Sequence, residues 1–209
     1  MIGNWGSTGR PRLVLPDPPL QVGALVLRPW EAGDRDALAA AWADPEVAQW
    51  TAVPDGRGPK VAARWIAGGC RRRDEGLALD LVGVSVEDGR VLGEVGLSAF
   101  DVERGAARIG WWTAASERGR GVATAMVRAL TGWAHGGPLA LWAVVAEVDP
   151  ANPASAAVAR AAGYELLGEV QGQLSGGSMT DSGTIDRLAF VSRRPACGVT
   201  DERESAARV

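Results

Sequence analysis

The chain of 209 residues has few of the side chains on which many catalytic and metal sites depend. It contains one histidine, His135, and two cysteines, Cys70 and Cys197. A Ser-His-Asp relay or a histidine-rich metal site would have to pass through His135 alone, so we expect neither, and no metal. The sequence also has no CxxC pair and no secreted disulfide framework, which excludes zinc fingers and favours a reducing cytoplasm.

A basic surplus, long apolar runs and a signal-peptide pattern are missing as well. The formal net charge is −3 and the pI is about 5.3, so we expect no nucleic-acid partner. Apolar stretches are interrupted by charges, and the first residues have no apolar core region, so we predict no membrane span and no signal peptide. The composition, 46% hydrophobic and 22% charged, is typical of a globular protein.

Most of the chain is predicted to form one domain, residues 21–192. Residues 1–20 contain several Gly and Pro without periodicity and are interpreted as an extended leader. Residues 193–209 are interpreted as a polar, disordered tail. No internal repeat or composition shift divides the segment between them.

The hydrophobic period of this domain changes repeatedly between that of strands and that of helices. Strands are predicted at Ala24–Arg28, Leu77–Val86, Val91–Phe100, Ala106–Thr113, Leu139–Glu147, Tyr164–Val170 and Thr184–Ser192. Helices are predicted at Asp34–Asp44, Pro59–Asp74, Val122–His135 and Pro153–Ala162, with a helical turn over Asp44–Trp50 and loops at 51–58 and 171–183. This succession indicates one mixed α/β sheet with helices on both faces.

The densest functional signal is the turn Arg118-Gly-Arg-Gly-Val-Ala-Thr124, between a strand and a long helix. Such a turn directs unpaired backbone N–H groups to one spot, and glycines let an anion reach them. We interpret it as a phosphate or pyrophosphate site. A Walker A loop would need a Lys, and Thr124 stands where a Rossmann fingerprint has its third Gly or Ala. A helix start that needs glycine only to turn tightly is the alternative.

A second motif, Asp149-Pro-Ala-Asn-Pro-Ala-Ser155, follows the apolar strand Leu139–Glu147. Asn152 suits an N-cap and Pro153 the first helical position, so capping alone would explain this motif. In this order and spacing, however, the two motifs together are more specific than either alone.

Together they resemble the GNAT superfamily of acetyl-CoA-dependent N-acetyltransferases, in particular its RimJ/RimL-like branch. Arg118-x-x-Gly121-x-Ala123 matches the family's Arg/Gln-x-x-Gly-x-Gly/Ala turn. Other matching segments, within residues 21–192, are Leu25–Pro29 with Asp34–Leu38, Asp44–Trp50, Ile109–Trp112, and Asn152-x-x-Ser155 with Ala162–Tyr164. The resemblance implies an α+β fold with a mixed, largely antiparallel sheet. This sheet would be splayed between the family's fourth and fifth strands, here Ala106–Thr113 and Leu139–Glu147.

The resemblance also implies how these residues would bind acetyl-CoA. The pantetheine arm would pair with the backbone of Trp112, Thr113 and Ala114, and an N–H near Trp112–Thr113 would polarise the thioester carbonyl. The pyrophosphate would be held by the amides of Gly119, Arg120, Gly121, Val122, Ala123 and Thr124, with added charge from Arg118 and Arg120. Asn152 would hydrogen-bond the arm, and Ser155 would protonate the leaving thiolate as general acid.

The general base does not follow from the family pattern. Many relatives have a Glu directly before the strand motif, where this chain has Arg108. A primary ammonium with a pKa of about 10 must lose a proton before it attacks, so another carboxylate is needed, directly or through water. We predict Glu94 on the preceding strand. Glu147, Asp149 and Glu169 are alternatives, and each of the four could instead be a solvated charge or an ion-pair partner.

Other reactive or aromatic side chains have simpler interpretations. His135 ends a helix and is expected to interact with its dipole. Cys70 has no evident activating base for a covalent intermediate. Trp30, Trp50 and Trp65 could line an acceptor pocket, but core packing is the expected role.

The predicted function is direct transfer of an acetyl group from acetyl-CoA to a primary amine within a ternary complex. The amine could be a protein α-amine, a lysine or a small molecule, and the enzyme a monomer or a homodimer. Two alternatives remain: a non-catalytic CoA-binding regulatory module, suggested by Arg108, and transfer of another acyl group such as succinyl.

Overall fold

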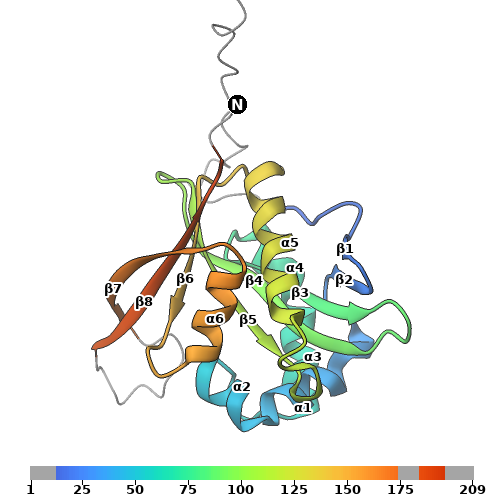
Figure 1. The fold of residues 1–209 in the computed structure, drawn as a ribbon. Helices are drawn as coiled ribbons and strands as arrows, with labels where there is room; N and C mark the ends of the chain where they lie inside the picture. The colour runs from blue at the N-terminus through green and yellow to red at the C-terminus, as the bar shows by residue number, and fades with distance from the viewer. Residues whose placement is uncertain (1–12, 174–183, 196–209) are drawn as a thin grey trace, which may run out of the picture.

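The computed structural model describes residues 13–173 and 184–195, which form one sheet in the order β1-β2-β3-β4-β5-β6-β8-β7 (Figure 1). The strands are β1 (Leu20–Val22), β2 (Leu25–Arg28), β3 (Ala78–Ser85), β4 (Val91–Asp101), β5 (Ala106–Thr113), β6 (Ala143–Val148), β7 (Glu165–Gln173) and β8 (Thr184–Arg193). The α-helices are α1 (Arg35–Ala43), α2 (Pro45–Trp50), α3 (Pro59–Ala67), α4 (Gly69–Asp74), α5 (Val122–Gly136) and α6 (Pro153–Ala161). Two 3₁₀ turns are η1 (Ala32–Asp34) and η2 (Ala115–Glu117). The predicted mixed fold is confirmed.

The sheet opens between β5 and β6. Every other pair of neighbouring strands is antiparallel, whereas β5 and β6 are parallel and pair only from Ala106–Ala143 to Arg108–Val145. Beyond Arg108, β5 continues to Thr113 without a described strand on this side. Backbone groups there are available to another partner. The splay implied by the family resemblance is therefore confirmed.

Helices cover both faces of the sheet (Figure 1). On one face, α5 and α6 lie over the main core, to which α5 contributes the predicted stripe of Met126 and Leu130. On the other face, α1, α2 and α3 enclose a second core of Leu38, Trp42 and neighbouring apolar residues, which includes Trp112 from β5. Each strand near the splay thus places alternate residues toward one core or the other.

The predicted helix Pro59–Asp74 is wrong as one element, because it is divided into α3 and α4. Two adjacent glycines, Gly68 and Gly69, lie at the break, and glycine is the least favourable helix residue after proline. The Gly68 amide closes α3 by donating to carbonyls of its last turn.

The predicted strand Leu139–Glu147 begins only at Ala143. Ala140 has a φ of +46°, which is incompatible with a strand. Leu139 and Leu141 are nevertheless buried on either side of this turn. The apolar run was therefore a correct signal for burial and a wrong one for conformation.

The ends of the chain also differ from the sequence-based boundaries. Leu20 already begins β1, a short edge strand that was not predicted, and Leu13 is buried in the main core. β7 extends to Gln173, into the predicted loop 171–183, and β8 extends to Arg193. The remaining parts of the predicted leader, loop and tail, residues 1–12, 174–183 and 196–209, lie outside the described residues.

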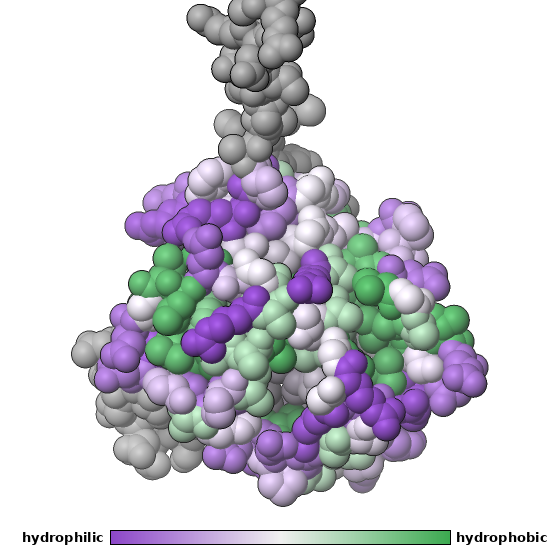
Figure 2. Space-filling view, in the orientation of Figure 1, coloured by the Kyte–Doolittle hydropathy of each residue, from purple (hydrophilic) through white to green (hydrophobic). Residues whose placement is uncertain are grey.

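Exposed apolar side chains gather near both edges of the sheet (Figure 2). Leu166, Leu167 and Val170 lie on the edge strand β7, and Val22 and Val86 lie near the opposite edge. Within the described residues, no helix is long and apolar enough to cross a membrane.

Candidate active site

Two cavities meet beside the splay. The Glu94 cavity, about 350 Å³, lies between β4, β5, β6 and β8, and includes Glu94, Arg108, Glu147, Asp149 and Arg187 in its lining. The glycine-turn cavity, about 450 Å³, lies between α2, α6 and the turn that begins α5. The residues that line both cavities are Trp50, Thr51, Trp111, Trp112, Asn152 and Ser155.

The turn before α5 has the conformation that only glycine adopts readily. Gly119 and Gly121 have φ values of +73° and +78°, in the left-handed region. A Cβ at either position would have no atom within 4 Å, so open space lies directly above this backbone. The amides of Val122, Ala123 and Thr124 occupy the first turn of α5, where helix carbonyls cannot accept them. The turn can therefore hold an anion on backbone N–H groups.

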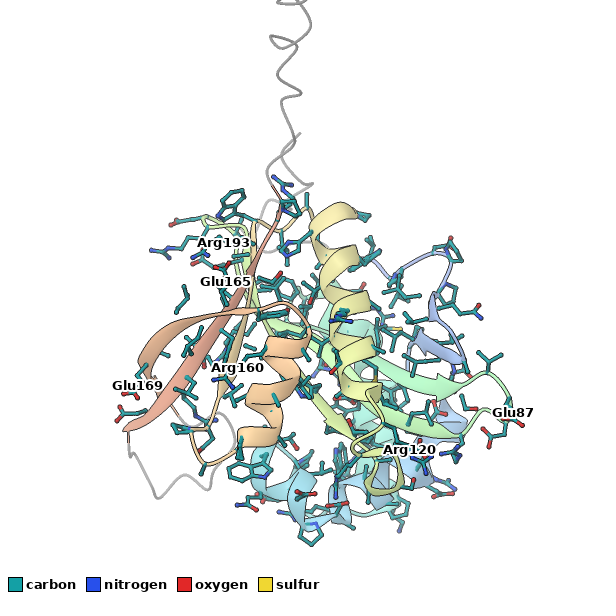
Figure 3. All side chains as sticks on the ribbon, in the orientation of Figure 1. Glu87, Arg120, Arg160, Glu165, Glu169 and Arg193 are labelled. Atoms are coloured by element: carbon teal, nitrogen blue, oxygen red, sulfur yellow. The ribbon has the colours of Figure 1, made fainter. Side chains whose placement is uncertain are left out.

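The two arginines of the turn have different surroundings. Arg118 lines the cavity and donates to Asp44 at 2.7 Å, with a second ion pair to Glu46, so it connects the turn to α2. Partial desolvation raises the pKa of Asp44, but hydrogen bonds from the Glu46 amide and Arg118 outweigh it and lower that pKa. Arg120 points outward, lies 3.6 Å from Glu117 and does not line the cavity (Figure 3).

The backbone of β5 presents alternate residues to the splay. The Ala114 amide donates to Leu92 of the β4 side at 2.9 Å, and its carbonyl accepts from Glu117. Both backbone groups of Ala114 are therefore engaged, and it lines neither cavity. Hydrogen-bonding directions alternate along a strand. The backbone N–H and C=O of Trp112 therefore also point to β4, whereas those of Trp111 and Thr113 point into the gap between β5 and β6.

Helix α6 brings two predicted residues to the junction of the cavities. The Asn152 side chain accepts from the Ser155 amide at 2.9 Å, so Asn152 caps the helix as the alternative interpretation held. It also lines both cavities, together with the half-buried Ser155. The Ser155 hydroxyl makes no hydrogen bond to any other described residue, which leaves it free to act on a ligand.

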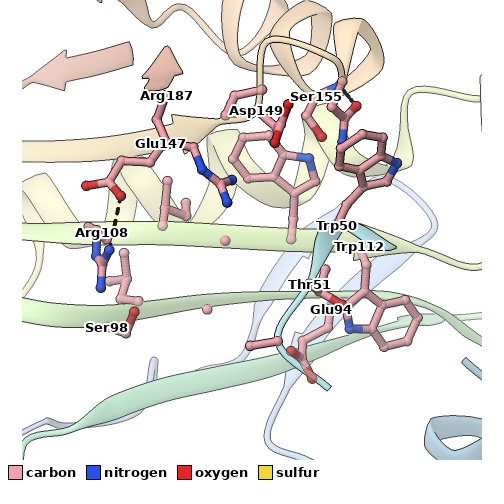
Figure 4. A pocket seen from close by; sticks show the side chains of 18 of the residues that line it. Trp50, Thr51, Glu94, Ser98, Arg108, Trp112, Glu147, Asp149, Ser155 and Arg187 are labelled. Carbon is pink, nitrogen blue, oxygen red and sulfur yellow. Dashed lines mark hydrogen bonds and ion pairs between the residues drawn. The ribbon is translucent and has the colours of Figure 1, made fainter. Parts of the chain in front are cut away.

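Glu94 lies inside the Glu94 cavity on β4, directly opposite Trp112 of β5 (Figure 4). The indole N–H of Trp30 donates to its Oε2 at 2.8 Å. Trp30 stacks on Trp112, with ring centroids 6.2 Å apart, and contacts Trp65 edge-on at 6.3 Å. Trp30 and Trp65 thus belong to the second core, as expected, and Trp30 also fixes the carboxyl of Glu94.

A second carboxyl, Asp80 of β3, lies diagonally opposite Glu94. Asp80 pairs with Gly96 of β4, two residues from Glu94, and Gly96 has no side chain to separate the two carboxyls. Asp80 accepts from Arg72 at 3.0 Å, and the Arg72 guanidinium lies 3.9 Å from the Trp65 ring centroid. Burial, followed by the charge of Asp80, raises the pKa of Glu94 to about 8, against the opposing effects of Trp30 and Arg72. A carboxyl with this pKa can gain and lose a proton at neutral to mildly alkaline pH.

The alternative carboxylates have different partners. Glu147 pairs with Arg108 at 3.0 Å across the splay, so the arginine that replaces the family's Glu is held by another carboxylate (Figure 4). Asp149 lines the cavity, where one of its oxygens accepts from the Ala151 amide at 2.8 Å. Glu169 is exposed on β7 and lines neither cavity.

The remaining reactive residues lie away from the cavities. His135 is buried and its ring nitrogens contact the Leu141 carbonyl at 2.9 Å and the Ser192 hydroxyl at 3.1 Å, so it connects α5 to the sheet instead of facing solvent at the helix end. Cys70 is an exposed free thiol on α4. No group of three His, Cys, Asp or Glu side chains within residues 13–173 and 184–195 could hold a metal ion.

Among the charged side chains of the Glu94 cavity, sequence reasoning missed Asp80 and Arg187. The signal for Asp80 was present in the period-two pattern, which places it on the same face of the sheet as Glu94. Arg187 could not be found in this way, because its position depends on how β8 returns beside β6.

Comparisons with known proteins agree with this geometry. The model of the acetyltransferase (GNAT) domain matches residues 24–165, more than half of the chain. No sequence among curated proteins matches. One similar solved structure is the ribosomal-protein-S5-alanine acetyltransferase from Vibrio fischeri, with a TM-score of 0.71 and 18% identity over 85% of this chain and 97% of that one.

Two further similar structures bear on the predicted branch. Mycobacterium smegmatis RimJ in complex with CoA-disulfide has a TM-score of 0.70 and 24% identity, over 84% of this chain and 85% of that one. RimL, a ribosomal α-N-protein acetyltransferase solved with coenzyme A, has a TM-score of 0.66 and 20% identity, over 82% and 95%. These neighbours confirm the RimJ/RimL-like fold. On the family match, the chain belongs to the GNAT family of acetyltransferases.

Proposed function

We propose that this protein transfers an acetyl group from acetyl-CoA directly to a primary amine, with both substrates bound in one ternary complex. The observation that carries this proposal is the meeting of two cavities at Trp112, Asn152 and Ser155. One cavity ends on amides at the start of α5, and the other contains the carboxyl of Glu94. A donor in the first and an amine in the second would meet beside the splay.

The glycine-turn cavity fits the donor in both shape and chemistry. Open space above Gly119 and Gly121 gives a pyrophosphate access to backbone N–H groups from Gly119 to Thr124. In the gap beside β5, Trp111 and Thr113 have the backbone orientation needed to pair with a pantetheine arm, and Asn152 lies within reach of it. We leave Ala114 and the side chain of Arg120 out of these contacts, since Ala114 is bonded within the protein and Arg120 points away.

Acetyl-CoA, when bound, supplies a thioester whose carbonyl carbon accepts the nitrogen. Glu94 takes the first proton from the acceptor ammonium, so that its lone pair is free to attack. The Thr113 amide donates to the carbonyl oxygen while the C–N bond forms and negative charge develops there. Ser155 donates a proton to the sulfur as the C–S bond breaks, and the second proton lost by the nitrogen then reprotonates the Ser155 oxygen. The products are an amide and a free thiol.

The acceptor, the cellular compartment and the oligomeric state are proposed from separate observations. Several of them are ribosomal-protein acetyltransferases, so a protein α-amine is one proposed acceptor, beside lysine and small amines. The free, exposed thiol of Cys70 suits a reducing cytoplasm, which we keep as the proposed location. The apolar side chains on β7 are where a homodimer contact would be tested against a monomer.

Two measurements test the proposal together. Calorimetric titration should show acetyl-CoA binding at micromolar to millimolar concentrations, and a thiol-release assay should show turnover on a panel of peptides and amines. Double-reciprocal plots at several acetyl-CoA concentrations should intersect, because direct transfer has no covalent enzyme intermediate. Absence of acetyl-CoA binding would overturn the proposal, and parallel lines would overturn direct transfer.

One observation favours a second candidate function. The Arg108–Glu147 ion pair occupies the place of the family's carboxylate, as it would in a CoA-binding regulatory module without catalysis. Binding without turnover across the panel would support that module. Competition between acetyl-CoA and succinyl-CoA would show whether another acyl group is the natural donor.

A further inference from the structure

We infer that the acceptor is a primary amine that also carries a carboxylate, and that Arg187 binds this carboxylate. The inference rests on the proposed function, because it names the acceptor class of the same site. It follows from a guanidinium in the Glu94 cavity that has no ion-pair partner among the residues that the structure describes.

Arg187 reaches the cavity because of the register of β8. Its neighbour Leu188 pairs with Val148 of β6 and packs against the main core. Since side chains alternate along a strand, Arg187 projects from the opposite face, toward the Glu94 cavity. Figure 4 shows its half-buried side chain pointing into this cavity from the β8 side.

The other guanidinium in the cavity lining, Arg108, and the guanidinium that contacts the lining residue Asp80, Arg72, each pair with a carboxylate. Arg108 pairs with Glu147 at 3.0 Å, and Arg72 pairs with Asp80 at 3.0 Å. Arg187 makes no hydrogen bond or ion pair with any residue that the structure describes, and Figure 4 draws none. A half-buried guanidinium without a counterion favours a ligand with a planar anionic group, since carboxylates bind its N–H fork in a bidentate way.

The same cavity also contains two carboxyl groups, Glu94 and Asp149, for the amine end of a ligand. Glu94 can receive the amine, and Asp149 has a carboxylate that no described basic side chain pairs with. A ligand with only positive charges, such as a polyamine, would bring its second ammonium against Arg187. A ligand with an amine and a carboxylate satisfies both signs at once, which is why we assign this class.

This chemistry has two sources, an acidic residue close to a peptide N-terminus and a free amino acid. Matched pairs separate them: amidated Ser-Asp-Asp against Ser-Asn-Asn, and glutamate against its diamide. Thiol release at saturating acetyl-CoA gives kcat/KM for each. We expect the carboxylate member of at least one pair to exceed its amide partner by about tenfold or more, as for charge-assisted hydrogen bonds. The pair that shows the preference identifies the source.

Arg187→Gln should bring this ratio close to one, while Arg187→Lys should keep part of it. The matched control is Arg193→Gln, which removes the same charge from the same strand at an exposed ion pair with Glu165, outside both cavities (Figure 3). It should keep the full ratio. If no acceptor turns over, titrating both members of each pair into the protein saturated with CoA gives the same comparison at equilibrium.

A wild-type ratio near one in both pairs, or a ratio that survives Arg187→Gln, overturns the inference. Equal or absent binding of both members in the CoA complex also overturns it. Failure of the proposed function looks different, because the protein would then give no calorimetric signal with acetyl-CoA.

Discussion

The half-buried carboxyl of Glu94 should make folding depend on pH, and Glu94→Gln isolates this effect. Burial and the charge of Asp80 raise the pKa of Glu94 from 4.5 to about 8, so folding favours the protonated acid. The stability that this group contributes is fully present below pH 4.5 and is lost as the pH rises through about 8. Since a tenfold change in proton affinity corresponds to about 1.4 kcal/mol, the full loss is at most about 5 kcal/mol.

Glutamine has the same shape and stays neutral, and its amide oxygen can still accept from Trp30. The variant should therefore gain stability relative to the wild type as the pH rises, with little difference at pH 5 and several kcal/mol at pH 9. Urea unfolding at pH 5, 7 and 9 measures this. The matched control, Glu87→Gln, removes a carboxylate from an exposed turn. A stability difference for Glu94→Gln that stays constant over this range would refute the reasoning.

Ionisation of Glu94 should also set how kcat/KM falls at low pH. With a pKa of about 8, about one tenth of the molecules carry the ionised base at pH 7, so kcat/KM for the acceptor should rise about tenfold by pH 9. Glu94→Gln should lose about 10²–10⁴ in kcat, the usual contribution of a general base. Both enzymes are assayed with one acceptor, so that its own deprotonation is common to both. A variant with wild-type rate and profile would exclude Glu94 as the base.

Three further substitutions test the rest of the site. Gly121→Glu should weaken CoA binding at least about 100-fold by calorimetry, because its φ of +78° disfavours a side chain and its carboxylate would face the pyrophosphate; Gly132→Glu, exposed on α5, should bind normally. Ser155→Ala should lower kcat about 10–100-fold with little change in the KM for acetyl-CoA, and an unchanged kcat would remove Ser155 from catalysis. Trp30→Phe removes a donor that lowers the pKa of Glu94, so the low-pH limb should move to higher pH; a limb that stays in place would show that this hydrogen bond does not tune the base.

Elements with local signals could be predicted from the sequence. The β3–β4 hairpin follows from period-two alternation and a turn in which Gly89 has a φ of +70°, and α5 follows from its apolar stripe between glycines. The turn at Ala140 could not be predicted, since nothing local disfavours a strand there and burial of Leu139 and Leu141 imposes it.

In the candidate site, too, residues with a local signal could be predicted from the sequence, and contacts between distant segments could not. Gly119 and Gly121 were recognisable because the turn itself requires their conformation. The partner of Arg118 was not, because Asp44 lies 74 residues earlier and only the packing of α2 brings it close. The proton affinity of Glu94 likewise depends on the register that sets Asp80 beside it.

The short pairing of β5 with β6 has a consequence for the protein without its substrate. The strands β1–β5 and β6–β8 are two halves of one sheet that are joined by only three residue pairs, so the sheet is weakly connected beyond Arg108. A pantetheine arm that hydrogen-bonds to both β5 and β6 would connect the two halves of the sheet. A ligand that binds only the folded state also raises the stability of that state by mass action. We therefore expect binding of the donor to hold the two halves of the sheet together and its release to loosen them. The concentration of acetyl-CoA would then set how rigid the enzyme is between turnovers.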